Sequence, residues 1–392
     1  RADSGVHLSL RLNLGGGAAP LPGYVNVDRI EGREAFPLDY EDGTVDEIRA
    51  SHVLEHFSHR EVPAVLRDWV RALKPGGRLA IAVPDFAVIA QQYMAGAPLP
   101  VEGYVMGGHA DANDRHGAIF DEEQLRDLMT AAGLVGIQRW HSRLQDCAAL
   151  PISLNLFGHK PPEAWPKVSA CMSTPRLGFM DNFFCSYQAL MPLRIPFRKF
   201  TGAFWGPCLT RAIEQTIEEE SPDYILTMDY DTVFTRWDVE ALMFTAMQHP
   251  EVDALAPLQA HRTQSTALFT LEDDDGKPMS EVRRDAFAGE LVRARTAHFG
   301  LTLLKVSALL ELPRPWFYGK PDPEGRWGEE RVDDDIAFWH AWRGAGKSLY
   351  LAPRVAVGHA ELMVRWPNRD LVATYQHPND FTARGKPDDV WR

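Results

Sequence analysis

The sequence has few cysteines, and none of them are paired at a metal-binding spacing. The four residues Cys147, Cys171, Cys185 and Cys208 lie far apart, with no Cys-x-x-Cys pair. This spacing supports neither a zinc site nor a disulfide framework. We therefore expect reduced thiols in the core of a cytoplasmic protein.

Long apolar runs and an excess of basic residues are also missing. No apolar run approaches the ~18 residues of a membrane-spanning helix, and the first residues contain no hydrophobic signal core. The net charge is −13. The segment up to Pro166 contains 15 basic and 22 acidic residues, and the segment after it contains 26 basic and 32 acidic residues. Neither half offers a basic surface, which argues against nucleic-acid partners. An anionic ligand would need a cation or oriented N–H groups.

What is present is ordinary globular composition at two-domain length. The chain has 392 residues, 45% of them hydrophobic and 24% charged, which suggests two or three domains. Three prolines within residues 159–166 mark a linker. We predict domains at 1–160 and 168–392, joined by a linker at 161–167. Strands and helices alternate on both sides, so both domains should be layered α/β structures.

The first half opens on a strand, a glycine turn and a second strand. Residues 8–14 form the first expected strand, and Gly15, Gly16 and Gly17 follow it directly. The second expected strand, residues 24–27, ends at Asp28. In doubly wound sheets an acidic residue at this position accepts hydrogen bonds from a nucleoside ribose. The glycine triplet alone is equally consistent with a plain tight turn.

Further elements of the first half have clear boundaries. A strand is expected at residues 45–50 and another at 78–83. Between them, Ser58 and Glu61 have capping-box spacing, and apolar residues from Val62 onward recur at helical spacing. Residues 75–77, Pro-Gly-Gly, are expected to stop this helix.

Together these segments resemble class I S-adenosylmethionine-dependent methyltransferases, particularly small bacterial members associated with surface-polysaccharide gene clusters. The resemblance covers roughly residues 8–160 and rests on residues 12–17, 24–28, 45–48, 51–56 and 73–79. It implies a Rossmann-like sheet with S-adenosylmethionine as the cofactor. The glycine turn would pack against its methionine part, Asp28 would bind the ribose and the loop at residues 38–40 would face the adenine. The cofactor-binding residues implied are Gly15, Gly16, Gly17, Asp28, Asp39, Tyr40 and His52. Gly16 stands where the family often has Cys or another small residue, which leaves open a domain that no longer methylates.

Two histidine-rich segments need separate interpretation. His52-x-x-Glu55-His56 matches a zinc-peptidase pattern, but it lies at an expected strand-to-helix turn rather than inside a long helix. We reject that interpretation. The polar segment 107–116 contains His109 and His116, either of which could take a proton from a sugar hydroxyl during methyl transfer. A surface loop hydrogen-bonded to itself is the alternative.

The second half contains an acidic pair in a favourable place. Three Asp-x-Asp pairs occur, at 229/231, 273/275 and 333/335, so the motif alone decides nothing. Only Asp229 and Asp231 follow a buried-type strand, expected at residues 223–228, where carboxylates converge at the carboxyl edge of a sheet. Two carboxylates there can hold Mg²⁺ or Mn²⁺, which would stabilise the charge of a departing nucleoside diphosphate.

The segment 167–365 resembles GT-A-fold glycosyltransferases of the family 2 type. The resemblance rests on Asp229-Tyr-Asp231, on residues 297–302, on Asp334-Asp335 at the start of a helix and on His359 after a late strand. It implies a nucleotide-sugar donor, a metal bound by Asp229, Asp231 and His359, and Asp335 as the general base, with Asp334 orienting the acceptor. The implied donor-binding residues are Thr174, Pro175, Arg176, Asp229, Tyr230 and Gly300. The alternative for residues 333–335 is that they merely cap the helix.

Two other features are given structural interpretations. Residues 344–348, Gly-Ala-Gly-Lys-Ser, end a helix and lack the earlier glycine of a phosphate-binding loop, so we predict a helix stop. Trp316, Phe317, Trp339 and Trp342 are expected in the core, with Trp316 as the best candidate for stacking on a sugar.

The sequence thus predicts a bifunctional enzyme that transfers a sugar to a glycan or small-molecule acceptor and O-methylates a glycan. One alternative is a glycosyltransferase whose first domain is only a scaffold. Another is a non-catalytic protein that binds or assembles glycans. Fold resemblance does not decide among them.

Overall fold

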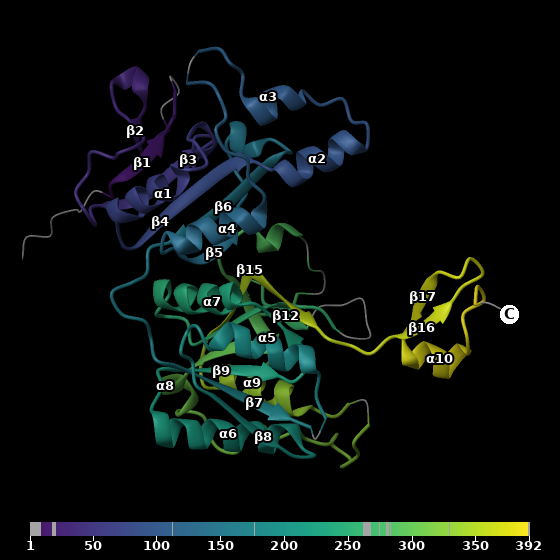
Figure 1. Cartoon of the computed structure of the whole chain (residues 1–392). Helices are drawn as coiled ribbons and strands as arrows, with labels where there is room; N and C mark the ends of the chain where they lie inside the picture. The colour runs from purple at the N-terminus through teal and green to yellow at the C-terminus, as the bar shows by residue number, and fades with distance from the viewer. Residues whose placement is uncertain are drawn as a thin grey trace, which may run out of the picture. The chain divides into compact units, whose positions relative to one another are not determined.

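The chain divides into two compact units, residues 1–165 and 166–392, and the boundary falls within the segment 161–167. Figure 1 shows this computed structural model, which describes residues 9–17, 21–111, 113–175, 177–261, 268–273, 275–279, 282, 284–328 and 330–390. Within these ranges, no helix combines the length and the apolar character that crossing a membrane requires.

A twisted, mostly parallel sheet forms the centre of the first unit. Its strand order is β2-β1-β3-β4-β6-β5, with β1 to β4 parallel and β6 antiparallel to both of its neighbours. The strands are β1 (Arg11–Leu14), β2 (Val25–Val27), β3 (Val45–Ser51), β4 (Leu73–Pro84), β5 (Val135–Arg139) and β6 (Ser153–His159). Because the chain passes from β1 outward to β2 and then back to β3, the order reverses at β1. The Rossmann-like sheet is confirmed, and its ligand crevice is expected beyond the carboxyl ends of β1 and β3.

The helices of this unit cover the sheet with apolar faces. They are α1 (Val62–Ala72), α2 (Phe86–Met94), α3 (Val101–Met106) and α4 (Glu122–Ala131). Helix α1 packs against β4 and α4, and it buries Val65, Leu66 and Trp69 completely. The predicted helix is thus confirmed, although it ends at Ala72 and β4 begins at the next residue.

Two local predictions in this region are only partly correct. Residues 75–77 lie within β4 rather than in a separate stop, at a shift in the β3–β4 register. A Cβ on Gly77 would lie 2.8 Å from the Lys74 carbonyl oxygen, so glycine lets the strand bend there. Of the capping box, the Glu61 carboxylate accepts from the Ser58 backbone N–H at 3.1 Å, while the Ser58 hydroxyl accepts from Arg60 instead.

The second unit is built on a mixed sheet with the order β12-β13-β15-β11-β14-β9-β7-β8, and β10 pairs with β15. Strands β8, β7 and β9 are parallel, and so are β11 and β15, whereas β14 is antiparallel to both β9 and β11. The strands are β7 (Val168–Thr174), β8 (Phe197–Thr201), β9 (Tyr224–Asp229), β10 (Thr232–Val233), β11 (Ala254–Gln259), β12 (Phe269–Leu271), β13 (Val292–Ala297), β14 (Leu301–Lys305) and β15 (Leu349–His359). A hairpin of β16 (Val364–Pro367) and β17 (Ala373–Gln376) follows.

Helices cover both faces of this sheet (Figure 1). Helix α6 packs on β7 and β8, α9 packs on β13, and α7 packs on β11 and β15 with α5 beside it. Their bounds are α5 (Met180–Leu190), α6 (Trp205–Glu220), α7 (Arg236–Gln248), α8 (Val306–Leu309), α9 (Asp334–Gly344) and α10 (Pro378–Arg384). Helix α9 ends at Gly344, as predicted for residues 344–348.

The four aromatic residues that the sequence analysis singled out in the second unit are core residues, as expected. Trp316, Phe317, Trp339 and Trp342 are each at most 3% exposed. The Trp339 and Trp342 indole N–H groups donate to backbone carbonyl oxygens of Ala297 and Ser348. Trp316 is therefore no stacking platform, because its ring is buried.

Strand β15 corrects the prediction of two short strands near residues 348–357. It is one strand, and its pairing with β11 skips from Ala352 to Ala356. Pro353 lies in the skipped segment and has no N–H for the ladder, so the chain bulges there and the strand continues afterwards.

Candidate functional site

A cavity of about 570 Å³ lies at the carboxyl edge of the first sheet. Three successive strand ends supply its wall: Gly15 after β1, Asp28 after β2, and His52 with Val53 after β3. The rest of the wall comes from residues 33–35, 56–58 and 111–117, as far as the structure describes them. This is the crevice at which the strand order reverses, and its size is within the roughly 300–1,000 Å³ typical of small-molecule sites.

The glycine turn and Asp28 form one hydrogen-bonded unit. One Asp28 carboxylate oxygen accepts from the Gly17 N–H at 2.9 Å, and the other accepts from the Ile30 N–H at 3.0 Å. Each oxygen keeps a further lone pair, so the half-buried carboxylate can still accept from a ligand hydroxyl. Gly15 has φ of +62°, a conformation that favours glycine.

Gly16 is required for reasons that the sequence did not reveal. A Cβ at this position would lie 2.1 Å from the Asn26 side-chain oxygen and 2.3 Å from the Asn13 side-chain nitrogen. Asn26 in turn donates to the Gly17 carbonyl at 3.0 Å. The two buried asparagines therefore leave no room for a side chain at residue 16.

The structure does not bring the 38–40 loop to this cavity. Asp39 and Tyr40 are absent from its described lining, which instead includes Arg33, Glu34 and Ala35. Arg71 of α1 holds the loop by donating to the carbonyl oxygens of Leu38 and Tyr40. These contacts draw the loop toward the helix and away from the strand ends.

The two candidate histidines of residues 107–116 have different surroundings. The Asp114 carboxylate accepts from the N–H groups of Gly108 and Ala110, and these bonds hold its pKa below the usual value. Most of the segment is therefore the self-bonded loop of the alternative interpretation. His109 lies in this loop and is absent from the cavity wall, whereas His116 lines it. Burial lowers the pKa of His116, opposed by the nearby Glu55 charge.

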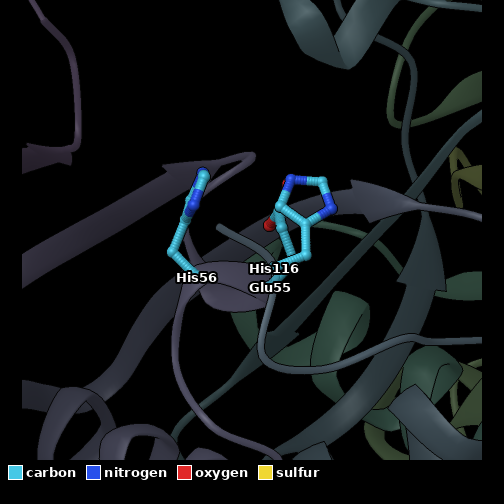
Figure 2. A group of neighbouring side chains, drawn as sticks. All are labelled: Glu55, His56 and His116. Carbon is cyan, nitrogen blue, oxygen red and sulfur yellow. The ribbon is translucent and has the colours of Figure 1, made fainter. Parts of the chain in front are cut away.

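Glu55, His56 and His116 converge, as Figure 2 shows, and both histidines line the cavity. Glu55 and His56 belong to a short 3-10 turn, Leu54–His56, that follows β3. His116 comes from the loop before α4, and it meets His56 with ring centroids 5.0 Å apart. One carboxylate oxygen and one nitrogen of each imidazole lie within 4.8 Å of one another. The sequence placed Glu55 and His56 in a segment that resembles methyltransferases and in a rejected peptidase pattern. It could not show that His116 joins them.

A second cavity, of about 760 Å³, lies at the edge of the second sheet. It brings together the carboxylates after β9, the start of α9 and the end of β15. The predicted residues on its wall are Asp229, Tyr230, Asp231, Asp334, Asp335 and His359. Residues that the sequence analysis did not single out also line it, including Trp205, His261 and Phe269. No pattern in the sequence identified them, because Trp205 starts a helix, Phe269 starts the short strand β12 and His261 lies in a loop.

Asp231 and His359 lie close together in this cavity. Asp231 is 2% exposed, and its carboxylate lies 3.5 Å from the His359 Nε2, because β10 pairs with β15 in a register that places Thr232 opposite His359. The His359 Nδ1–H donates to the Ala260 carbonyl at 3.1 Å. Burial raises the pKa of Asp229 to about 6, against a hydrogen bond from the Trp205 indole N–H.

The three carboxylates at the start of α9 have different partners. Asp333 pairs with Arg331 and makes no side-chain capping bond, and Asp334 accepts from the Gly319 N–H at 2.6 Å. Asp335 accepts from the Ile336 N–H at 2.8 Å. Burial, more than the neighbouring carboxylates, raises the pKa of Asp335. Asp334 is thus occupied in holding the loop at residue 319, and Asp335 has the environment of a proton acceptor.

The remaining predicted donor residues lie elsewhere or outside the described part. Thr174 and Pro175 are not among the described lining residues of the second cavity, and the Thr174 hydroxyl donates to the Phe200 carbonyl oxygen. Arg176 is outside the residues that the structure describes. Gly300 supports the cavity from behind, since its carbonyl oxygen accepts from the Asp229 N–H at 3.4 Å.

Comparison with known proteins gives one family match. Residues 22–139 match the family model described as a methyltransferase domain; the match covers much of the first sheet and does not extend into the second unit. No curated protein matches the sequence. The first unit therefore contains a segment similar to methyltransferase domains.

Solved structures give weaker likenesses. A SAM-dependent methyltransferase of Thermotoga maritima, described as a possible histamine N-methyltransferase, is 19% identical over 39% of this chain and 82% of its own, with a TM-score of 0.28. A197 from STIV is 14% identical over 57% of this chain and 97% of its own, with a TM-score of 0.33. Phosphoethanolamine N-methyltransferase 2 of Haemonchus contortus was solved with S-adenosyl-L-methionine. It is 13% identical over 40% of this chain and 49% of its own, with a TM-score of 0.25. These values are too low to indicate what this chain acts on.

Proposed function

We propose that the first unit transfers a methyl group from S-adenosylmethionine to a hydroxyl group of a glycan. The observation that carries this proposal is the cavity at the reversal point of the sheet, with Gly15, Asp28 and His52 supplied by three strand ends. The match of residues 22–139 to a methyltransferase domain supports it independently.

Some residues of the cavity wall would bind the cofactor, and others would bind the acceptor. Bound S-adenosylmethionine would supply a sulfonium-activated methyl group. The Asp28 carboxylate would accept from the ribose hydroxyls with its remaining lone pairs, while the turn at Gly15 allows close approach of the backbone. On the opposite wall, His116 donates its Nδ1–H to the Tyr104 carbonyl at 3.1 Å. Its Nε2 therefore has a lone pair to which an acceptor hydroxyl can donate.

Replacing Asp28 by alanine should weaken S-adenosylmethionine binding at least tenfold. The substitution removes the ribose acceptor and also frees the Gly17 and Ile30 N–H groups, each of which costs about 1 kcal/mol or more if left unpaired. Isothermal titration calorimetry measures the change directly.

A cofactor analogue separates the two contributions. If Asp28 holds the ribose, the substitution should weaken S-adenosylhomocysteine more than its 2′,3′-dideoxy analogue. Asp39→Ala is the matched control, because the structure places this carboxylate outside the described cavity wall. Equal losses for both ligands would assign Asp28 to the turn alone.

The second unit supports a second candidate function, transfer of a sugar from a nucleotide-sugar donor. The observation in its favour is the convergence of Asp229, Asp231, His359 and Asp335 on one cavity of about 760 Å³. Two carboxylates and an imidazole suit Mn²⁺ and also permit Mg²⁺. The His359 Nδ1–H is bonded to a backbone carbonyl, as is usual for metal-ligating histidines. A cation there would supply positive charge for the leaving diphosphate.

The chain's own residues would then position and deprotonate the acceptor. Asp335 is half-buried in the cavity wall and has a raised pKa, which suits acceptance of a proton from an attacking hydroxyl. With both activities the chain would be bifunctional. If only the second unit acts, the first would serve as a scaffold; if neither acts, both cavities would serve glycan binding or assembly.

A further inference from the structure

We propose that Glu55, His56 and His116 form a site for a divalent transition-metal cation such as Zn²⁺, at the wall of the first cavity. Two histidines and one carboxylate form a common catalytic zinc ligand set, which leaves a coordination position for water or substrate. Imidazole ligands favour such a cation over Mg²⁺ or Ca²⁺.

The buried carboxylate is the first observation that carries the site. Glu55 is 1% exposed, and neither of its carboxylate oxygens has a hydrogen-bond partner among the described residues. A carboxylate this deep is costly unless something positive compensates it.

The adjacent His52 does not donate to Glu55 in its neutral form. The Ser153 hydroxyl donates to the Asn155 side-chain oxygen at 2.8 Å. Ser153 must therefore accept from the His52 Nε2–H, at 3.0 Å. Neutral His52 then presents its Nδ1 lone pair to the Glu55 carboxylate, 3.1 Å away. The His52 lone pair and the Glu55 carboxylate repel each other at this distance, so a positive charge beside them would stabilise the arrangement.

The second observation is the tautomer of both candidate histidine ligands. His56 donates its Nδ1–H to the Arg115 carbonyl at 3.3 Å, and His116 donates its own to the Tyr104 carbonyl. A carbonyl oxygen can only accept, so the Nε2 of each neutral ring has an available lone pair. A backbone carbonyl on the other ring nitrogen is the usual outer-shell arrangement of a metal-ligating histidine.

The backbone holds the two segments together in this arrangement. The Glu55 carbonyl accepts from the N–H groups of Gly117 and Ala118, at 2.7 and 3.2 Å. A Cβ on Gly117 would lie 2.7 Å from the Phe57 carbonyl oxygen, so glycine permits the close approach. Tetrahedral ligands at 2.0–2.1 Å from zinc lie about 3.4 Å apart. One ring nitrogen of each histidine and one Glu55 oxygen already lie within 4.8 Å of one another, so the side chains would have to approach by up to about 1.4 Å to reach that geometry.

The role of the cation rests on the proposed function. The cavity lies beside His56 and His116, so an acceptor hydroxyl could bind the open position. A bound cation lowers the pKa of such a hydroxyl, whose proton would pass to solvent as the oxygen attacks the methyl group. Ligation and proton acceptance compete for the same His116 lone pair, and we assign it to ligation.

Zn²⁺ binding in the absence of S-adenosylmethionine tests the site. The full chain carrying Asp231→Ala removes the second candidate metal site from the titration. We expect this parent to bind one Zn²⁺ in competition with a chromogenic chelator. Adding His116→Ala or Glu55→Gln should weaken binding by at least tenfold. His141→Ala is the matched control, because this exposed histidine of the same unit lies outside the described cavity wall, and it should leave the affinity unchanged.

Co²⁺ gives a readout that unfolding cannot imitate. Circular dichroism identifies variants that retain the fold, and in these the visible bands of bound Co²⁺ should change with His116→Ala and not with His141→Ala. Absence of Zn²⁺ binding by the parent, or equal affinity in folded His116→Ala, would overturn the proposal and leave an ion pair between His52 and Glu55. S-adenosylmethionine titrated separately decides the proposed function, so either can fail alone.

Discussion

Alanine in place of Asp231 is expected to reduce the proposed metal-dependent sugar transfer by roughly 10³-fold or more. Asp231 is almost fully buried and lies next to His359, so no water can take over its position without rearrangement. Loss of the cation would remove several kcal/mol of charge stabilisation from the departing diphosphate. Each 1.36 kcal/mol added to the activation free energy lowers the rate tenfold. The measurement is Mn²⁺-stimulated hydrolysis across UDP-, GDP- and dTDP-sugars.

Two controls accompany this variant. S-adenosylmethionine affinity should be unchanged, because Asp231 and Asp28 belong to different units. Asp273→Ala removes a carboxylate from another Asp-x-Asp pair and should keep full activity, because the Asp273 side chain accepts from the Asp275 and Lys277 N–H groups of a turn. Full activity of Asp231→Ala would contradict the metal-assisted proposal.

Asparagine in place of Asp335 should cut turnover by roughly 10²-fold or more while keeping donor and metal binding. The amide has nearly the same shape and can still accept from the Ile336 N–H, but it cannot take a proton. Steady-state kinetics should show the loss in kcat with little change in KM for the donor.

Product stereochemistry checks the same assignment. A base acting on an acceptor that attacks opposite the diphosphate gives an inverted anomeric centre, which NMR of the product reveals. Asp273→Asn is the control, because this carboxylate caps a turn and lies outside the described wall of the second cavity. A retained configuration would defeat the base mechanism and leave the metal site unaffected.

The sequence was most informative where a strand end and a polar residue coincide. Asp28, Asp229 and Asp231 could be placed because each follows a strand that the sequence indicates, by alternating apolar and polar residues or by a run of apolar residues. Parallel strands bring their carboxyl ends to one edge of the sheet. The structure places all three on cavity walls. Periodicity likewise located α1, since its buried residues recur at helical spacing.

Residues in loops were less predictable for a physical reason. His116 reaches Glu55 through backbone hydrogen bonds between segments about sixty residues apart, and no local pattern encodes that pairing. The 38–40 loop was misplaced because Arg71, distant in sequence, holds it against α1. The glycine at residue 16 could not be explained from the sequence, because the asparagines that exclude a Cβ there, Asn13 and Asn26, come from two different strands.

The central claim is that the first unit binds S-adenosylmethionine in the cavity beyond β1, β2 and β3. Calorimetric titration of the full chain with S-adenosylmethionine tests it most directly. The account predicts one site per chain, competition by S-adenosylhomocysteine, and loss of at least tenfold in affinity with Asp28→Ala. Absence of binding at millimolar cofactor, or binding that Asp28→Ala leaves unchanged, would contradict it.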